Sequence, residues 1–130
     1  MAYLAVLITA IAGFAIGAVW YGVLSRQWIK AAGIAVGADG KPQGGSPLLM
    51  VYGFLCVLVV AGMMRHAFAM SGITTPGMGV VSGFGIGAFF ITPWITLNAL
   101  FGMKPKELPM IDGGYATVAC AVMGGVLTLF

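Results

Sequence analysis

Long apolar runs alternate with short polar stretches along the chain, and this pattern predicts its architecture. Four runs cover residues 2–24, 47–66, 78–100 and 109–130, with few charged side chains inside them. A helix needs about 20 apolar residues to cross the hydrocarbon core of a bilayer. The runs are continuous and lack the alternation of a β-barrel strand. We therefore predict an all-α fold, a polytopic membrane protein with four transmembrane helices in a bundle that forms one domain over residues 1–130.

Proline and glycine mark where the predicted spans begin and end. Residues 38–46 are dense in Gly and contain a Pro, so they form a loop. Pro47 is well placed to open the second span, because proline suits the first turn of a helix; we expect this span to end near His66 or one turn later. Pro93 lies inside the third span and should kink it. The fourth span begins at Pro109, with Asp112 in its first turn.

Composition supports a membrane setting for the chain. Hydrophobic residues make up 61% of the chain and charged residues only 7%, whereas soluble domains carry about 25% charged residues. The net charge of +3 comes from six Lys and Arg against three Asp and Glu. These cations are sparse and lie between apolar runs, so they indicate membrane topology or headgroup contact and not nucleic-acid binding.

The distribution of the cations predicts an orientation. The loops after the first and third spans share one side of the membrane and hold five cations, Arg26, Lys30, Lys41, Lys104 and Lys106. The opposite side holds only Arg65. By the positive-inside rule, the two basic loops face the cytoplasm and both chain termini lie outside.

Glycines inside the spans predict how the helices pack. Gly79, Gly83 and Gly87 repeat every four residues on the third span, and Gly13 and Gly17 do the same on the first. Lipid provides no hydrophobic drive between helices, so small residues that allow close backbone approach are the main route to tight packing. These grooves could hold the four helices together, or they could face a partner chain or a second copy.

A cluster of polar and aromatic side chains is predicted near the cytoplasmic face. Its members end or begin spans on that side: Trp20, Tyr21, Asn98, Asp112 and Tyr115. A carboxylate within an apolar segment is costly unless it is paired, which makes Asp112 a candidate for a gate, a relay or a ligand site. Alternatively, a position in the first helical turn favours a negative charge, a nearby lysine or arginine neutralises it, and Asn98 only bridges two helices.

Other residue types give little indication of catalysis or metal binding. His66 is the single histidine and the two cysteines, Cys56 and Cys120, lie within apolar runs, so a metal site would have too few ligands. Trp20, Tyr21 and Trp28 are typical of the aromatic belt at the membrane surface. With no nucleophile–base pair or paired carboxylates, we expect no enzymatic activity. We predict no cofactor, although a bound lipid or pigment is compatible with the sequence.

Two stretches of the chain resemble a bacterial four-helix membrane family catalogued as domain of unknown function 1761. The first is Gly17-Ala18-Val19-Trp20-Tyr21 followed by Trp28-Ile29-Lys30 and Gly33, and the second is Asn98-Ala99-Leu100-Phe101 followed by Ile111-Asp112-Gly113-Gly114-Tyr115 and Met123-Gly124. The chain departs from the family pattern at Gly22-Val23, where members often have Ser-Pro, and in its glycine-rich loop. The resemblance implies four helices, a bacterial inner-membrane location, and the five cluster residues as the positions of interest.

These features lead to three hypotheses for function, of which a membrane enzyme ranks last because too few residues could carry out chemistry. The first is an accessory or structural subunit that packs against a larger membrane complex or associates with itself, since the chain has glycine grooves and almost no mass outside the membrane. Its expected partners are membrane lipids and either another membrane protein or further copies of the chain. The alternative is an oligomeric channel or transporter for a small solute, with Asp112 and Asn98 at its cytoplasmic mouth.

Overall fold

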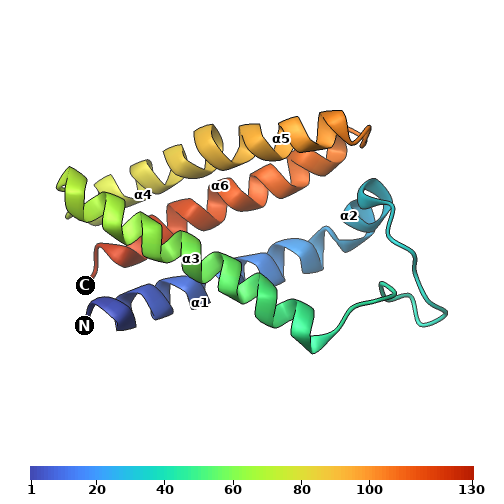
Figure 1. The fold of residues 1–130 in the computed structure, drawn as a ribbon, viewed down its shortest axis with the longest axis horizontal. Coiled ribbons are helices and arrows are strands. Elements are labelled where there is room, and N and C mark those ends of the chain that lie inside the picture. Colours follow the sequence, from blue (N-terminus) through green and yellow to red (C-terminus); the bar gives the residue numbers. More distant parts are fainter.

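The computed structural model describes residues 1–130 and confirms the predicted all-α fold (Figure 1). The elements in chain order are α1 (Ala2–Val23), α2 (Ser25–Ala32), α3 (Pro47–Ser71), α4 (Pro76–Ile86), the π-helix η1 (Gly87–Ile91), α5 (Thr92–Phe101) and α6 (Glu107–Leu127). Four helical segments are long and apolar enough to cross a membrane, namely α1, α3, the continuous run from α4 to α5, and α6. Each meets the length that a bilayer core requires.

Capping residues fix where α3 and α4 begin. The Ser46 hydroxyl accepts a hydrogen bond from the Leu49 amide at 3.2 Å, and the Thr75 hydroxyl accepts one from the Met78 amide at 3.3 Å. Each cap is followed by a proline in the first turn, where its missing N–H costs nothing. α3 continues past His66 to Ser71, because residues 67–70 are apolar and the first glycine able to end the helix follows them.

The start of α6 changes the interpretation of Asp112. The helix begins at Glu107, and Glu107 is the acidic residue of its first turn. Asp112 therefore lies in the second turn, and the prediction that placed it in the first was wrong. Proline at position 109 misled that prediction, since prolines are tolerated throughout the first turn of a helix, where the N–H groups have no partner within the helix.

The third span contains a π-turn shortly before its proline. Pro93 has no N–H to donate, and Gly87–Ile91, which end two residues before it, form the wider π-helix. The Thr92 amide donates to the Gly87 carbonyl, and the Thr92 hydroxyl lies 2.7 Å from the same oxygen. The hydroxyl thus supports the widened turn.

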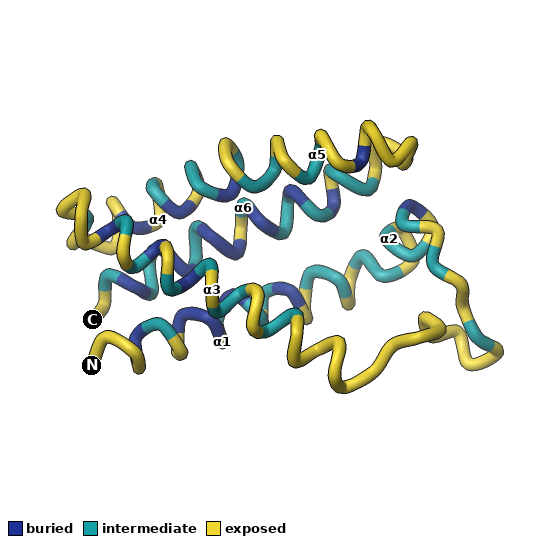
Figure 2. Tube along the Cα trace, viewed as in Figure 1, coloured by how far each residue is buried: buried dark blue, intermediate teal, exposed yellow.

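α6 is the centre of the bundle. It packs against α4, η1 and α5 on one side and against α1 on the other, and it meets α3 through buried side chains of the C-terminal half of α3, among them Met64 and Phe68. The glycines of the third span face α6: a Cβ at Gly79 or Gly83 would collide with the backbone carbonyls of Gly124 and Cys120. In Figure 2 the dark, buried stretches gather along α6 and the sides of α1 and α4 that face it.

α3 diverges from the rest of the bundle toward its N-terminus. It crosses α1, where the Phe14 and Phe54 rings meet edge to face at 5.6 Å. Before that crossing, residues 47–52 are exposed, and Figure 2 shows this part of α3 in the colour of exposed residues. A space between α3 and the neighbouring helices follows from this divergence.

The two ends of the bundle differ in charge. The N- and C-termini and the α3–α4 turn lie at one end, and α2, the loop of residues 33–46 and the α5–α6 turn lie at the other (Figure 1). The second end, called here the basic end, carries five of the six Lys and Arg residues, namely Arg26, Lys30, Lys41, Lys104 and Lys106.

Candidate functional site

The shortest side-chain hydrogen bond of the bundle joins α1 to α6 near the basic end. The Tyr21 hydroxyl donates to Oδ1 of Asp112 at 2.6 Å. Both side chains are half-buried. A hydroxyl bonded to a carboxylate at this distance is among the stronger hydrogen bonds in proteins, because the acceptor is charged. The pair therefore fixes the end of α1 to the second turn of α6.

Two further hydrogen bonds tie α1 to α6. The Trp20 indole donates to the Ile111 carbonyl at 2.9 Å, and the Tyr115 hydroxyl donates to the Gly13 carbonyl at 2.9 Å. Glycines make room for both rings. A Cβ at Gly114 would lie 2.6 Å from the Trp20 ring, and one at Gly17 would lie 3.0 Å from the Tyr115 ring. Gly17 therefore belongs to the aromatic site, and Gly13 supplies both a carbonyl and room for the Met123 side chain.

Three aromatic rings from three helices meet beside the carboxylate. The Tyr21 ring lies 5.4 Å from the rings of both Trp28 and Tyr115, in edge-to-face geometry with interplanar angles of 68°. Such pairs are favoured because the positive edge of one ring meets the negative face of the other. Trp28 comes from α2, the short helix that follows α1. Sequence analysis assigned Trp28 to the aromatic belt and did not place it in the cluster.

A cavity of about 370 Å³ adjoins this group of residues. Its walls come from α1, α2, α3, η1, α5 and α6, and its thirteen lining residues are Tyr21, Trp28, Cys56, Val57, Val60, Ile91, Ile95, Asp112, Tyr115, Ala116, Ala119, Cys120 and Met123. Asp112 is the single charged residue among them. We call this space the carboxylate cavity. It combines an apolar lining with one charged group and two phenols, as ligand sites commonly do.

A second space of about 590 Å³ lies between α1 and the first half of α3. It shares Tyr21, Trp28, Val57 and Tyr115 with the carboxylate cavity, so the aromatic rings stand between the two. Its remaining lining residues are Phe14, Gly17, Ala18, Leu49, Met50 and Gly53. We call this space the α1–α3 groove. It contains no charged side chain.

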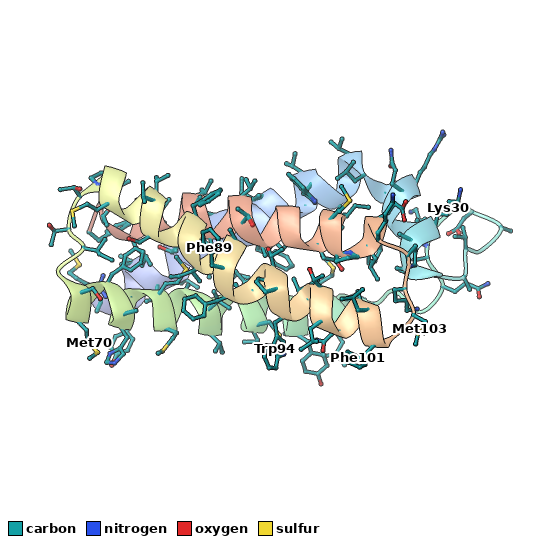
Figure 3. The ribbon with its side chains drawn as sticks, turned by 90° about the horizontal axis from the view of Figure 1, so that it is seen from above. Lys30, Met70, Phe89, Trp94, Phe101 and Met103 are labelled. Carbon is teal, nitrogen blue, oxygen red and sulfur yellow. The ribbon has the colours of Figure 1, made fainter.

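Of the other predicted members of the cluster, Asn98 shares a space with Asp112 alone. Asn98 is exposed and lines a crevice at the basic end with Lys104 and Asp112. The partner of the carboxylate is the Tyr21 phenol and not the Asn98 amide. Trp94, one turn before Asn98, is 68% exposed and projects away from the bundle in Figure 3. Four of the five predicted residues thus meet at the α1–α6 contact, and Asn98 lies on the far side of Asp112.

The alternative explanation for Asp112, neutralisation by a nearby lysine or arginine, stays a prediction: Lys104 lines the crevice beside Asp112 but has another hydrogen-bond partner. The Lys104 ammonium donates to the Ala32 carbonyl, at 3.4 Å, and so ties the α5–α6 turn to the end of α2. The helix terminus is also occupied by another acid, Glu107. The hydrogen bond from Tyr21 is what the structure provides for the carboxylate.

Comparison with known proteins identifies the family. A family model described as "Protein of unknown function (DUF1761)" matches residues 4–128. The chain belongs to the DUF1761 family. No curated protein and no solved structure matches the chain. The match confirms the family predicted from the two sequence stretches, and it covers nearly all of every helix as well as both cavities.

The four apolar helices make this DUF1761 protein a multi-pass membrane protein. In such a setting, polar groups within the spans must find partners among themselves. The Tyr21–Asp112 pair and the indole and phenol bonds to backbone carbonyls follow that rule.

A second polar group of the DUF1761 protein joins the third span to α6 and was missed from the sequence. The Thr92 hydroxyl lies 3.1 Å from the Gly113 carbonyl, and the Thr117 hydroxyl donates to the same carbonyl at 2.8 Å. A side chain at Gly113 would collide with Thr92. The i, i+4 spacing of Gly113 and Thr117 was visible, but Thr92 reaches them only because the π-turn sets the angle of α5.

The remaining candidate ligands are dispersed. No group of three or more His, Cys, Asp or Glu residues could hold a metal ion. His66 is exposed on α3. Cys56 and Cys120 are free thiols that both line the carboxylate cavity, the first on the exposed side of α3 and the second buried in α6.

Proposed function

We propose that this DUF1761 protein is a non-catalytic accessory subunit of the membrane that associates with another membrane helix through the α1–α3 groove. The observation that carries the proposal is the small-residue lining of that groove: Ala18 and Gly53 face a space of about 590 Å³. Small residues let a helix backbone approach closely, which is the main source of affinity between helices in lipid.

The other glycine groove is not free for this purpose. Gly79, Gly83 and Gly87 meet the backbone of α6 inside the same chain. The alternative left open by the sequence, that this stripe faces a partner, is therefore not the basis of the proposal. In the α1–α3 groove, by contrast, Ala18 is exposed and Gly53 is only partly covered.

We assign the groove to a second copy of the chain. The first half of α3 forms one wall of the groove and also exposes the apolar side chains of Leu48, Val51 and Leu55. Each copy thus offers both a groove and an exposed helix. A two-fold symmetric dimer uses both at once, and such dimers are the commonest closed assemblies of soluble proteins.

The proposed orientation follows from charge. The basic end carries five cations, which favours the cytoplasmic side under the positive-inside rule. In a bacterial inner membrane, both termini would then lie on the periplasmic side.

Native mass measurement after purification in a mild detergent tests the assembly. We expect a particle of twice the 13.4 kDa chain mass. Gly53→Leu should fill the groove and yield a monomer. The matched control is Gly85→Leu, because nothing lies within 4 Å of a Cβ at Gly85, and this variant should stay dimeric. A wild-type protein that is strictly monomeric and co-purifies with no other chain contradicts the proposal. If the protein co-purifies with a different membrane protein, that protein and not a second copy occupies the α1–α3 groove.

A transport role is the second candidate, and one observation favours it. Asp112 lines both the crevice at the basic end and the carboxylate cavity, so one carboxylate borders a polar space and an apolar one. Proton flux into liposomes, followed with an enclosed pH-sensitive dye, tests this candidate. It predicts flux above that of empty liposomes, lost in Asp112→Asn. Equal flux for the wild type and empty liposomes contradicts proton movement as the transported species.

A further inference from the structure

No residue that lines the carboxylate cavity carries a charge opposite to that of Asp112, and Lys104 borders Asp112 only in the crevice at the basic end. Twelve of the thirteen residues that line the cavity are hydrophobic and the thirteenth is Asp112. Tyr21 donates one hydrogen bond to Oδ1. A carboxylate accepts several hydrogen bonds through its two oxygens, so the second oxygen keeps its capacity for a further donor. A charged group in an apolar membrane site is expensive unless a partner of opposite charge is present.

The aromatic rings around the carboxylate favour the same kind of partner. Tyr21, Trp28 and Tyr115 all line the cavity, and their centroids lie 5.4 Å apart in two adjoining pairs. The face of an aromatic ring attracts an ammonium or other organic cation, most strongly when water is excluded. A carboxylate beside three aromatic rings is therefore complementary to a positive charge on an organic group.

The rest of the cavity matches an apolar body. Val57 and Val60 come from α3, Ile91 and Ile95 from the third span, and Ala116 and Ala119 from α6. A volume of about 370 Å³ lies at the small end of the range for organic ligand sites, which is roughly 300–1,000 Å³. The volume suits a ring or a short branched chain together with a small charged head.

We propose that the carboxylate cavity binds an amphipathic organic ammonium. The cation lies beside Asp112 and the aromatic rings, and the apolar body of the ligand lies among the aliphatic side chains. The site belongs to the single chain and does not depend on the proposed dimer. The ammonium could belong to a freely diffusing amine or to the headgroup of an aminophospholipid, which share this chemistry.

Calorimetric titration in an uncharged maltoside detergent tests the proposal with two probes. Benzylammonium carries the charge and three N–H donors, and ethylbenzene is its uncharged carbon isostere. We expect the wild type to bind the cation at least tenfold more tightly than the isostere. Equal affinities for the two probes, or no binding of the cation, would overturn the proposal, and this comparison needs no variant.

Asp112→Asn tests the role of the charge. This variant keeps an oxygen that can accept from Tyr21, and we expect at least a tenfold loss of affinity for the cation with the affinity for the isostere unchanged. Glu107→Gln is the matched control, since it removes a carboxylate from the first turn of the same helix outside the cavity. It should leave both affinities unchanged. Wild-type cation affinity in a folded Asp112→Asn protein would overturn the proposal.

Two tryptophan substitutions on α3 locate the binding. Val60→Trp should fill the cavity and abolish binding of the cation. Val59→Trp, at a neighbouring position that is 72% exposed, should bind it as the wild type does. Unchanged binding in the folded Val60→Trp protein would show that the cation binds elsewhere and would overturn the assignment to this cavity.

Competition identifies the source of the ammonium. Phosphatidylethanolamine added to the micelles should displace the probe if a lipid headgroup is the ligand, whereas phosphatidylglycerol, which lacks an ammonium, should not. Without displacement by either lipid, the cation selectivity of the site points to a free amine. Displacement by both lipids alike would overturn the proposal, since it would show that acyl chains and not the charge fill the cavity.

Discussion

The two sides of α6 are packed by different means. On one side α4 approaches until glycine backbones meet the carbonyls of α6, at Gly79 and Gly83. On the other side α1 meets α6 largely through side chains, and Trp20 and Tyr115 donate hydrogen bonds to backbone carbonyls across the contact. The C-terminal half of α3 joins the buried cluster of α6 through Met64 and Phe68, whereas the first half of α3 diverges and the two cavities lie beside it.

These two kinds of helix contact are suited to different roles. Backbone-to-backbone contact leaves no room for a ligand and tolerates no added atoms, so the α4–α6 pair is suited to hold the fold. Contacts through large side chains leave irregular space around them, and here that space adjoins a carboxylate. Substitutions at matched positions on the two sides should therefore have effects of very different size.

Gly83→Ala should have the largest effect on stability. Its Cβ would collide with the Cys120 carbonyl, and a backbone atom cannot move aside as a side chain can. We expect a loss of about 1–3 kcal/mol in the free energy of unfolding, typical of overpacked interiors. Thermal or denaturant unfolding in detergent, followed by circular dichroism, measures it. A loss below about 0.5 kcal/mol would mean that the two helices are less closely packed than described.

Tyr21→Phe should have an intermediate effect. The change removes the hydroxyl that donates to Asp112 and keeps the ring that meets Trp28 and Tyr115. Hydrogen bonds between helices in membranes are worth about 0.6–2 kcal/mol, and we expect a loss in that range under the same unfolding conditions. Tyr52→Phe is the matched control, because Tyr52 is exposed on α3. Equal effects of the two changes would contradict a special role for the α1–α6 pair.

Gly53→Ala should have the smallest effect. A Cβ there would lie 3.5 Å from the Phe14 ring, an ordinary contact, and the rest of the position faces the α1–α3 groove. We expect the free energy of unfolding to change by no more than about 0.5 kcal/mol, as at surface positions. A loss as large as that of Gly83→Ala would show that α3 is packed as tightly as α4.

The four-span fold and the close contact of the third span were accessible from the sequence. Each span is an apolar run of sufficient length, and Gly79, Gly83 and Gly87 share one helix face whatever the surroundings. The pairing of Tyr21 with Asp112 was only partly accessible. The polar ends of the spans indicated proximity, but the partner depended on which way Asp112 faces, and the packing of α6 between α1 and the third span sets that direction.

Features that depend on tertiary packing could not be predicted. Trp28 has the position of a belt residue in the sequence, and it joins the cluster only because α2 folds back beside α6. The prediction that grouped Asn98 with Tyr21 relied on both residues lying near one membrane face. Nearness to a membrane face gives the depth of a residue in the membrane, but it does not say on which side of the bundle the residue lies. The divergence of α3 likewise could not be predicted from the sequence. Apolar side chains lie on all sides of this helix, so no pattern marks the side that packs against the bundle.

The π-turn at Gly87–Ile91 has a consequence for any change in chain length. Such a turn accommodates one residue more than an α-helical turn, and one residue corresponds to a rotation of about 100° around the helix axis. Deleting a single residue within this turn would therefore regularise the helix and leave α5 facing as it does now, because the wider turn already absorbs the extra residue. A one-residue deletion in the regular part of α4 would instead rotate α5 relative to α4 by about 100°, and Ile95 would leave the wall of the carboxylate cavity. The third span can thus lose one residue at Gly87–Ile91 without changing which face of α5 meets α6.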